Sequence, residues 1–411
     1  MTQTHTSSLR GRRLRAASLL AVGAALLAGS GPAAAQSLLA SRGLGYVNPP
    51  VDARARGLGG AGLALPGGGL SLVNPAAIAA LPAPAITVSF QPDFYDATLP
   101  GGESDGSTAR FPLLHAVFPF GQRWTFSAGY GSFVDQTWAV ERLDTLRLGE
   151  REVEFTDRFI SRGGVTRLRA GAAYSVTERF SVAAAADLYT GSVRDTLSRR
   201  FAPGDSLLSR RVDLAPASYG TAFTYRGLGA AAGVRWVPTD ALNLAAAVAL
   251  GGTLEARPAE GDSVSVGRDY PLPLTFDVGA SGRVAPRALV VLNAQWAGWS
   301  TADDELAATG GARDSWTVAG GVEMGSATPG QRTFPVRVGA RYARLPFRWG
   351  PASEGNDFPD ERALTAGLGA RLAGGAAQVD LAAERGWRGG DAAALDESYW
   401  RLGLSLTLLG R

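Results

Sequence analysis

The sequence predicts an all-β protein, a fourteen-stranded antiparallel transmembrane β-barrel with an N-terminal plug segment. Three observations support this prediction. From Ala85 onward, segments of about ten residues alternate apolar with small or polar side chains. The breaks between these segments alternate between short and long. The residues before Ala85 are rich in glycine and alanine and follow an export signal.

Residues 1–35 form the export signal. Residues 10–15 contain four arginines, an apolar run covers residues 16–29, and three alanines end at Ala35. A positively charged start, a short apolar stretch and small residues at its end are the parts of a secretory signal peptide. We therefore expect cleavage after Ala35.

The net charge of the mature chain is close to zero. The full chain has 40 Lys and Arg against 37 Asp and Glu, and removing the four signal arginines leaves 36 against 37. This balance does not predict nucleic-acid binding. Beyond the signal, no apolar run reaches the about 18 residues of a transmembrane helix, so we expect strands to cross the membrane.

Residue types on which many enzymes depend are scarce. The chain contains no cysteine and no lysine, which excludes disulfides, thiolate nucleophiles and lysine Schiff bases. His115 is the only histidine after the signal, and a catalytic triad would have to form around this one residue. We expect no enzymatic activity, no metal and no cofactor.

The alternation is clearest in the last segment. Between Trp400 and Leu408, the even positions are large and apolar, and the odd positions are Arg, Gly, Ser and Thr. Residues 274–281 and 336–342 follow the same pattern. Such a strand has one apolar face and one polar face. The apolar face would point to the core in a soluble sandwich and to lipid in a membrane barrel.

The lengths of the breaks favour the barrel. Outer-membrane barrels have short periplasmic turns and long extracellular loops, whereas a sandwich does not sort its connections in this way. Six short turns and seven long loops give fourteen strands with both chain ends in the periplasm. The residues 134–163 either extend strands above the membrane or form a hairpin of their own. The short breaks are at 120–123, 176–179, 237–240, 284–287, 325–331 and 374–377, and the long ones are near 93–110, 134–163, 192–218, 253–271, 300–313, 346–361 and 388–397.

Aromatic residues near the expected strand ends predict two interfacial girdles. They are Phe118, Phe120, Trp124, Tyr174 and Trp236 beside short turns, and Trp299, Trp316, Trp387 and Trp400 beside long loops.

Residues 36–84 precede the barrel, which we expect to cover 85–411. Gly57, Gly59 and Gly62 have the spacing of a dinucleotide-binding fingerprint, but no strand leads into them and no helix leaves them. Asn74 and Pro75 instead predict the start of a short helix that ends at Leu81. A small-residue segment with a short helix suits a confined space, so we predict that it plugs the barrel.

The stretch "ARARGLGGAGLAL…LSLVNPAAIAAL" resembles the N-terminal signature of the FadL-type outer-membrane proteins. The resemblance implies a fourteen-stranded barrel with an N-terminal plug in the bacterial outer membrane. It also implies passive uptake of small hydrophobic or amphipathic molecules such as fatty acids or aromatic hydrocarbons. "LPGGG" stands where an acidic residue is often found, and the chain ends "TLLGR" without a terminal aromatic residue.

The related PorV-type barrels of type IX secretion have a similar start, which gives an alternative function. In that case the partner is a secreted protein, and the barrel serves secretion or surface attachment. Under the first reading the partners are outer-membrane lipid and a small apolar ligand.

Arginines on the predicted inner face are candidates for two roles. Arg235, Arg283 and Arg371 come just before short turns, where they are expected to hold the plug by bonding its carbonyls and Asp52. Arg341 and Arg401 lie nearer the other end and are candidates to receive a ligand carboxylate. The alternative is a polar lumen in which acidic residues balance these charges. Those acidic residues are Asp277, Asp380 and Glu384.

Gly129 and Gly131 lie two apart in the expected third strand, "WTFSAGYGSF". Glycine in a strand marks a bulge or kink, and FadL-type proteins are thought to open at a kink in their third strand. We therefore predict a lateral opening at these glycines. The alternative is that they relieve crowding inside the barrel.

Overall fold

The computed structural model describes residues 37–67, 70–99, 102–148, 151–201, 217–259, 266–325, 334–349, 358–389 and 395–410. The predicted signal peptide lies outside these residues. None of the helices in the described part of the chain is long and apolar enough to cross a membrane.

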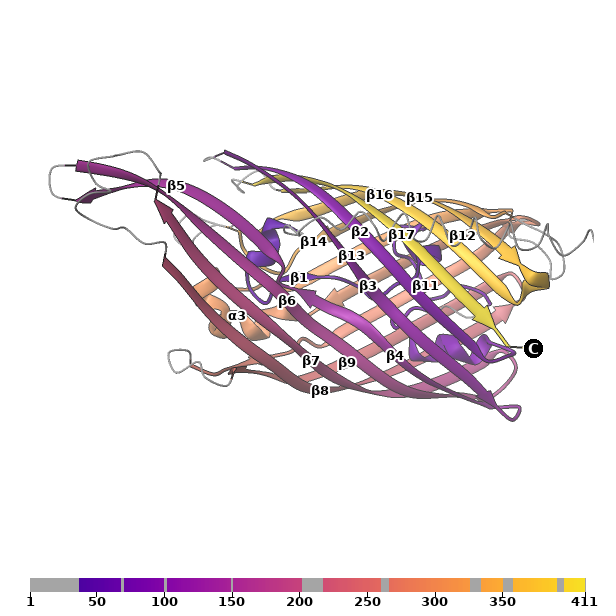
Figure 1. Ribbon diagram of the computed structural model, residues 1–411. Coiled ribbons are helices and arrows are strands. Elements are labelled where there is room, and N and C mark those ends of the chain that lie inside the picture. Colours follow the sequence, from indigo (N-terminus) through magenta and orange to yellow (C-terminus); the bar gives the residue numbers. More distant parts are fainter. Residues whose placement is uncertain are drawn as a thin grey trace, which may run out of the picture. The chain divides into compact units, whose positions relative to one another are not determined.

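Most of the described chain is strand, and the helices are short (Figure 1). The elements are η1 (Leu38–Ser41), β1 (Tyr46–Val47), α2 (Ala53–Arg56), η2 (Pro75–Ala80), β2 (Ala85–Leu99), β3 (Gly102–Phe120), β4 (Trp124–Asp135), β5 (Trp138–Leu148), β6 (Arg151–Ser175), β7 (Phe180–Phe201), β8 (Ala217–Thr239), β9 (Leu242–Pro258), β10 (Arg268–Pro271), β11 (Thr275–Ala285), β12 (Ala288–Ala297), η3 (Trp299–Ala302), α3 (Asp303–Leu306), η4 (Ala307–Thr309), β13 (Ser315–Met324), β14 (Val336–Arg344), β15 (Asp360–Leu372), η6 (Ala373–Gly375), β16 (Ala377–Gly389) and β17 (Asp396–Leu409).

The strands from β2 to β17 form one closed antiparallel barrel. β4 and β5 both pair with β6 and make one position of the ring, and β10 and β11 both pair with β9 and make another. The ring closes where β17 pairs with β2. In the described residues the barrel therefore has fourteen strand positions, which confirms the predicted fold class.

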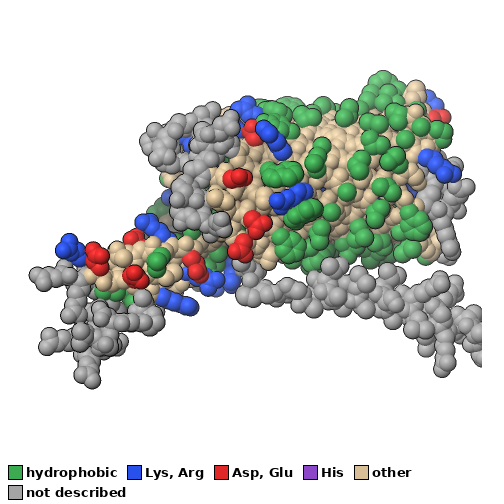
Figure 2. Space-filling model, turned by 90° about the horizontal axis from the view of Figure 1, so that it is seen from above, with side chains coloured by type: hydrophobic (Ala, Val, Ile, Leu, Met, Phe, Trp, Pro, Cys, Tyr) green, Lys and Arg blue, Asp and Glu red, His purple; other side chains and the backbone are tan. Residues whose placement is uncertain are grey.

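The alternating pattern separates the outer face from the lumen as predicted. In β17, Trp400 is 50% exposed on the outside, whereas Arg401 is 1% exposed and faces the lumen. Figure 2 shows hydrophobic side chains spread over the barrel wall on the face in view. An apolar outer face with a polar interior is the arrangement of a barrel that lies in a bilayer.

One predicted girdle residue is in the wrong place. Trp299 belongs to η3, is 2% exposed and packs against Phe133 and Phe347 inside the barrel. The prediction failed because the residues after β12 fold inward as short helices instead of continuing the strand.

The two ends of the barrel differ as the break lengths predict. Five of the six short turns lie within the described residues, and the sixth, at 325–331, lies mostly outside them. At the other end the strands run far beyond the about ten residues that cross a bilayer, since β6, β7 and β8 have 25, 22 and 23 residues. β5 pairs with β6 from Trp138 opposite Ser161 to Leu148 opposite Arg151, and β4 pairs with the same strand nearer the turns. This region therefore extends the strands of the barrel.

Single cysteines should report the orientation, because the chain has none of its own. Glu141 in β5 and Asp240 in the β8–β9 turn both have exposed side chains. We expect a membrane-impermeant maleimide to label Glu141→Cys on intact cells, and Asp240→Cys only after the outer membrane is broken. Labelling of both on intact cells would contradict the assignment of the short turns to the periplasm.

Residues 37–67 and 70–84 form what we call the lumenal segment. Its helix α2 packs against β15, β16 and β17, and η2 packs against β6, β7 and β8. Since these contacts involve inward-facing side chains from opposite sides of the ring, the segment lies within the barrel. The first barrel strand then begins at Ala85.

Candidate functional site

Short local signals fold the lumenal segment. The Asp52 carboxylate caps α2 by accepting a bond from the Ala55 amide at 2.8 Å. Asn74 caps η2 in the same way, at 2.9 Å from the Ala76 amide, and Pro75 occupies the first helical position. The helix predicted to reach Leu81 is therefore present, in the tighter 3-10 form and ending at Ala80.

Gly57 and Gly59 allow the segment to approach the wall, and Gly62 allows the segment to pack against itself. Gly59 has a φ of +77°, and a Cβ there would lie 2.3 Å from the Ala340 carbonyl oxygen. A Cβ at Gly62 would lie 2.9 Å from the Cβ of Ala55. The Gly59 amide donates to the Thr365 hydroxyl at 2.9 Å. These positions are therefore occupied by glycine because the backbone comes close to other groups there, which glycine permits.

Glu384 is the centre of a buried group of charges that ties the lumenal segment to the wall. It is 0% exposed and accepts bonds from Arg56 at 3.2 Å, Arg341 at 2.5 Å, Arg401 at 3.2 Å and the Tyr399 hydroxyl at 2.7 Å. Arg56 belongs to α2, and the others belong to the last strands of the barrel. We call these five residues the Glu384 cluster.

Further ion pairs surround this cluster. Arg341 also bonds Glu361 at 2.7 Å, and Arg401 bonds Asp93 at 2.9 Å. A second buried group joins α2 to β13, where Glu323 accepts from Arg54 at 2.9 Å and from Arg337 at 2.7 Å. Buried charges are tolerated when they are paired and hydrogen-bonded in this way.

The two predicted ligand arginines face the lumen, but each already has carboxylate partners. Arg341 bonds Glu361 and Glu384, and Arg401 bonds Asp93 and Glu384. A ligand carboxylate at either arginine would have to displace an existing ion pair. Of the three acidic residues expected to balance these charges, Glu384 pairs with both arginines, whereas Asp277 and Asp380 pair with neither in the described residues. A ligand-binding role of Arg341 and Arg401 stays a prediction.

The anchoring predicted for Arg235, Arg283 and Arg371 differs from what the structure contains. Arg235 donates to Asn243 at 2.9 Å, and Arg283 donates to the Pro286 carbonyl in its own turn. Arg371 is exposed. Within the described residues, none of the three bonds the lumenal segment, because their positions next to the turns let the side chains reach turn groups or solvent.

Other polar side chains, missed at the sequence level, bond the carbonyls of the lumenal segment. Arg167 and Arg169 of β6 both donate to the Leu72 carbonyl, at 2.8 and 2.9 Å. The His115 ring nitrogen Nδ1 lies 2.8 Å from the Leu70 carbonyl oxygen, and the Ser281 hydroxyl donates to Ala64 at 2.6 Å. In the sequence, their position on predicted inner faces is the one feature that indicates contact with the lumenal segment.

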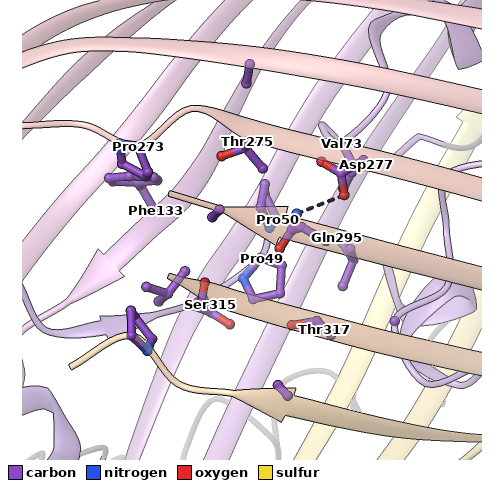
Figure 3. Close-up of a pocket in the computed structure, with 18 of the residues that line it drawn as sticks. Pro49, Pro50, Val73, Phe133, Pro273, Thr275, Asp277, Gln295, Ser315 and Thr317 are labelled. Atoms are coloured by element: carbon purple, nitrogen blue, oxygen red, sulfur yellow. Dashed lines mark hydrogen bonds between the residues drawn. The ribbon is translucent and has the colours of Figure 1, made fainter. Parts of the chain in front are cut away.

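A cavity of about 180 Å³ lies between the lumenal segment and the barrel wall (Figure 3). Its lining is mostly apolar, with Trp299 and Phe133 in contact at one side, their ring centres 6.1 Å apart. The apolar lining includes Val47, Pro49, Pro50, Val73, Phe133, Leu272, Pro273 and Trp299.

Polar and charged side chains interrupt this apolar lining, among them Arg167, Arg169, Arg341, Arg344, Asp277 and Glu361. Figure 3 shows Asp277 of β11 and Gln295 of β12 joined by a hydrogen bond, which the Gln295 amide donates at 2.9 Å. Thr317 lies on the neighbouring strand β13. An apolar cavity with a few placed polar groups is the usual form of a small-molecule site.

The barrel wall beside this cavity lacks one strand pairing. β3 and β4 are paired from the turn at 121–123 only as far as Leu113 and Gly131. Beyond Gly131, β4 pairs instead with β1 of the lumenal segment, Val47 opposite Val134. The Arg110 guanidinium of β3 reaches across to the Asp135 carboxylate of β4 at 3.1 Å.

Gly129 and Gly131 themselves are fully paired on both sides, with β3 and with β6. A Cβ at Gly129 would lie 2.8 Å from the side chain of Leu72, and one at Gly131 would lie 2.6 Å from that of Pro50. The glycines therefore make room for the lumenal segment, and the ladder between β3 and β4 ends immediately after them.

In the part of the chain that the structure describes, no group of three or more His, Asp or Glu side chains is placed to hold a metal ion. None of the residues that line the cavity is a histidine.

Solved structures with the same architecture exist. A Pseudomonas aeruginosa FadL homologue superposes with a TM-score of 0.59 and 15% identity, covering 88% of this chain and 99% of that one. The barrel has the FadL-type fold. The CymD monoaromatic hydrocarbon channel also superposes, with a TM-score of 0.56, 17% identity and coverage of 90% of this chain and 99% of that one. The Pseudomonas putida toluene transporter TodX superposes with a TM-score of 0.56, 15% identity and coverage of 89% and 100%.

The FadL-type fold and the apolar outer face identify the chain as a bacterial outer-membrane barrel. No protein-family model matches the chain. A search of curated proteins likewise gives no match.

Proposed function

We propose that the chain is an outer-membrane channel through which small hydrophobic molecules diffuse inward. The observation that carries this proposal is the apolar cavity inside the barrel, between the wall and the lumenal segment. The hydrocarbon and toluene channels that share its fold support the same class of substrate.

The size of the cavity favours molecules with a single ring. A dry apolar cavity of about 150 Å³ in another protein holds benzene, and this cavity measures about 180 Å³. A monocyclic hydrocarbon with a small substituent fits such a volume.

The lumenal segment acts as the plug. Its contacts with β6–β8 on one side and β15–β17 on the other leave it spanning the lumen. Buried ion pairs and bonds to its carbonyls hold it there. Hydrophilic solutes are excluded, whereas an apolar molecule is accepted by the cavity.

We propose that the substrate leaves sideways, through the break between β3 and β4. Val47 and Asn48 line the cavity and also lie at this break. β1 therefore separates the cavity from the break. An apolar molecule gains more by entering the bilayer than by entering the aqueous periplasm. Movement of β1 away from β4 opens this route.

Filling the cavity tests the proposal. Thr317 points into the cavity, and Val318, the next residue of β13, points outward and is 49% exposed. We expect Thr317→Trp to reduce uptake of radiolabelled toluene by cells at least tenfold, because the indole occupies the cavity. Val318→Trp adds the same side chain on the lipid face and should leave uptake near the wild-type value.

Both variants are compared at equal amounts of folded barrel, measured by the heat-dependent shift in gel mobility. Equal toluene uptake by Thr317→Trp and Val318→Trp would show that the cavity is not on the route.

A further inference from the structure

Some of the residues that line the cavity have acceptor oxygens that receive no hydrogen bond from the protein. Asp277 is 5% exposed, and its Oδ1 accepts from Gln295. Within the described residues, its other oxygen, Oδ2, has no hydrogen-bond partner, and no cation lies within ion-pair distance of the carboxyl group. A carboxyl group keeps at least one accepting oxygen in either protonation state.

Asn48 also lines the cavity. Its Nδ2 lies 2.9 Å from the Ser132 hydroxyl oxygen, and that hydroxyl donates its one hydrogen to the Asn48 carbonyl. The hydroxyl must therefore accept from Nδ2, which fixes the orientation of the amide. The buried Asn48 Oδ1 is left without a partner.

Asn293 lies on β12 opposite Gly279 and also lines the cavity, and its buried Oδ1 likewise lacks a partner. Both amide oxygens have almost no accessible surface, so the acceptor that a ligand can reach is Asp277 Oδ2. An acceptor without a donor costs free energy, and a ligand that supplies the donor removes that cost.

The charges that line the cavity disfavour a charged ligand. Six charged side chains line it. Arg169 pairs with Asp187 and Arg341 pairs with Glu361, whereas Arg167, Arg344 and Asp277 belong to no ion pair in the described residues. An ammonium group is repelled by the two arginines without carboxylate partners, and a carboxylate group is repelled by Asp277 and has no hydrogen to donate to it. A hydroxyl group both donates and accepts and carries no charge.

We propose that this cavity selects uncharged monocyclic molecules that carry a hydroxyl group, the hydroxyl donating to Asp277. This selectivity rests on the proposed channel function and names its substrate class. The bare hydrocarbon fits the apolar lining but leaves Asp277 Oδ2 unpaired. The cavity therefore discriminates by hydrogen bonding as well as by size.

Calorimetric titration of the purified barrel with four ligands of one ring size tests this selectivity. The ligands are p-cresol, its methyl ether 4-methylanisole, toluene and p-toluate. The ether keeps the oxygen of p-cresol but has no hydrogen to donate. We expect p-cresol to bind about tenfold more tightly than 4-methylanisole, the effect of one hydrogen bond to a charged or buried acceptor. p-Toluate should bind more weakly than toluene.

Two substitutions at Asp277 test whether this residue causes the preference for p-cresol over 4-methylanisole. Asp277→Leu should bring the ratio of p-cresol to 4-methylanisole affinity close to one. Asp277→Asn keeps a carbonyl acceptor and should retain a preference for p-cresol above that of the leucine variant. The comparison of ligands on the wild-type barrel stands even if a variant fails to fold.

The outcomes separate the two proposals. Binding of toluene without any preference for p-cresol, or tightest binding of p-toluate, would overturn the hydroxyl selectivity and leave the channel for hydrophobic molecules in place. Binding of none of the four ligands would overturn both.

Discussion

Glu384→Ala is expected to make the outer membrane leaky to small hydrophilic solutes while the barrel still assembles. Arg341 keeps Glu361 and Arg401 keeps Asp93 in this variant, but Arg56 loses its only ion-pair partner in the described residues. Arg56 is 1% exposed. An unpaired buried charge costs about 3 to 5 kcal/mol.

This cost falls on the docking of the lumenal segment, because Arg56 belongs to α2 and the barrel strands keep their ladders. A cost of about 3 kcal/mol shifts the docking equilibrium by about a hundredfold. Undocking of the lumenal segment opens the lumen to hydrophilic solutes. This opening is measured by single-channel conductance in planar bilayers and by the sensitivity of cells to a large hydrophilic antibiotic.

Asp240→Ala is the matched control. It removes a carboxylate that also pairs with an arginine, Arg179, but both side chains are exposed in the neighbouring β6–β7 and β8–β9 turns. Exposed ion pairs contribute little, so this variant should conduct like the wild type. If Glu384→Ala conducts no more than Asp240→Ala, the Glu384 cluster does not hold the plug in place.

A disulfide between Val47→Cys and Val134→Cys is expected to stop uptake until it is reduced. The Asn48 amide donates to the Phe133 carbonyl at 3.0 Å, so the next pair, Val47 and Val134, is a non-hydrogen-bonded pair. The Cα atoms of such a pair are about 4.5 Å apart, which lies within the range of disulfides. The bond fixes β1 on β4 and closes the proposed route.

The measurement is uptake of radiolabelled toluene before and after treatment with a reductant. The chain has no other cysteine, so no competing disulfide forms. We expect at least tenfold slower uptake when oxidised, and full recovery when reduced. Each single cysteine variant should respond to neither treatment. Equal uptake by the oxidised and reduced double variant would mean that β1 does not move during transport.

The architecture of the barrel could be predicted from the sequence because each strand carries its own signal. A strand between water and lipid, or between lumen and lipid, must alternate residue types, and Trp400 and Arg401 show this directly. The turns could be predicted because their lengths are sorted between the two ends. The caps at Asp52 and Asn74 are also local, and Asn74 followed by Pro75 predicts a helix start from the sequence alone.

The candidate site could be predicted only in part. Which carboxylate meets Arg341 depends on the register of β14, β15 and β16, which alternation alone does not give. The partners of Arg167 and Arg169 are carbonyl groups, which every residue has. The position of the cavity depends on how the lumenal segment packs in the barrel, because the cavity is the part of the lumen that the segment leaves unfilled. A secretion-associated role like that of the PorV-type barrels stays a prediction.

The contacts of the lumenal segment join the two ends of the chain. Ser37 bonds Glu397, 360 residues later, and Arg56 bonds Glu384, 328 residues later. The ring itself closes through β17, where Ser405 bonds Ser89 of β2.

The residues that are synthesised first therefore find their partners only after the last strands have been made. Contacts of such separation form late in folding because they close the longest loops. A chain truncated before β16 retains most of its strands and lacks the groups that receive Arg56. Docking of the lumenal segment therefore requires that the last strands of the barrel have been made.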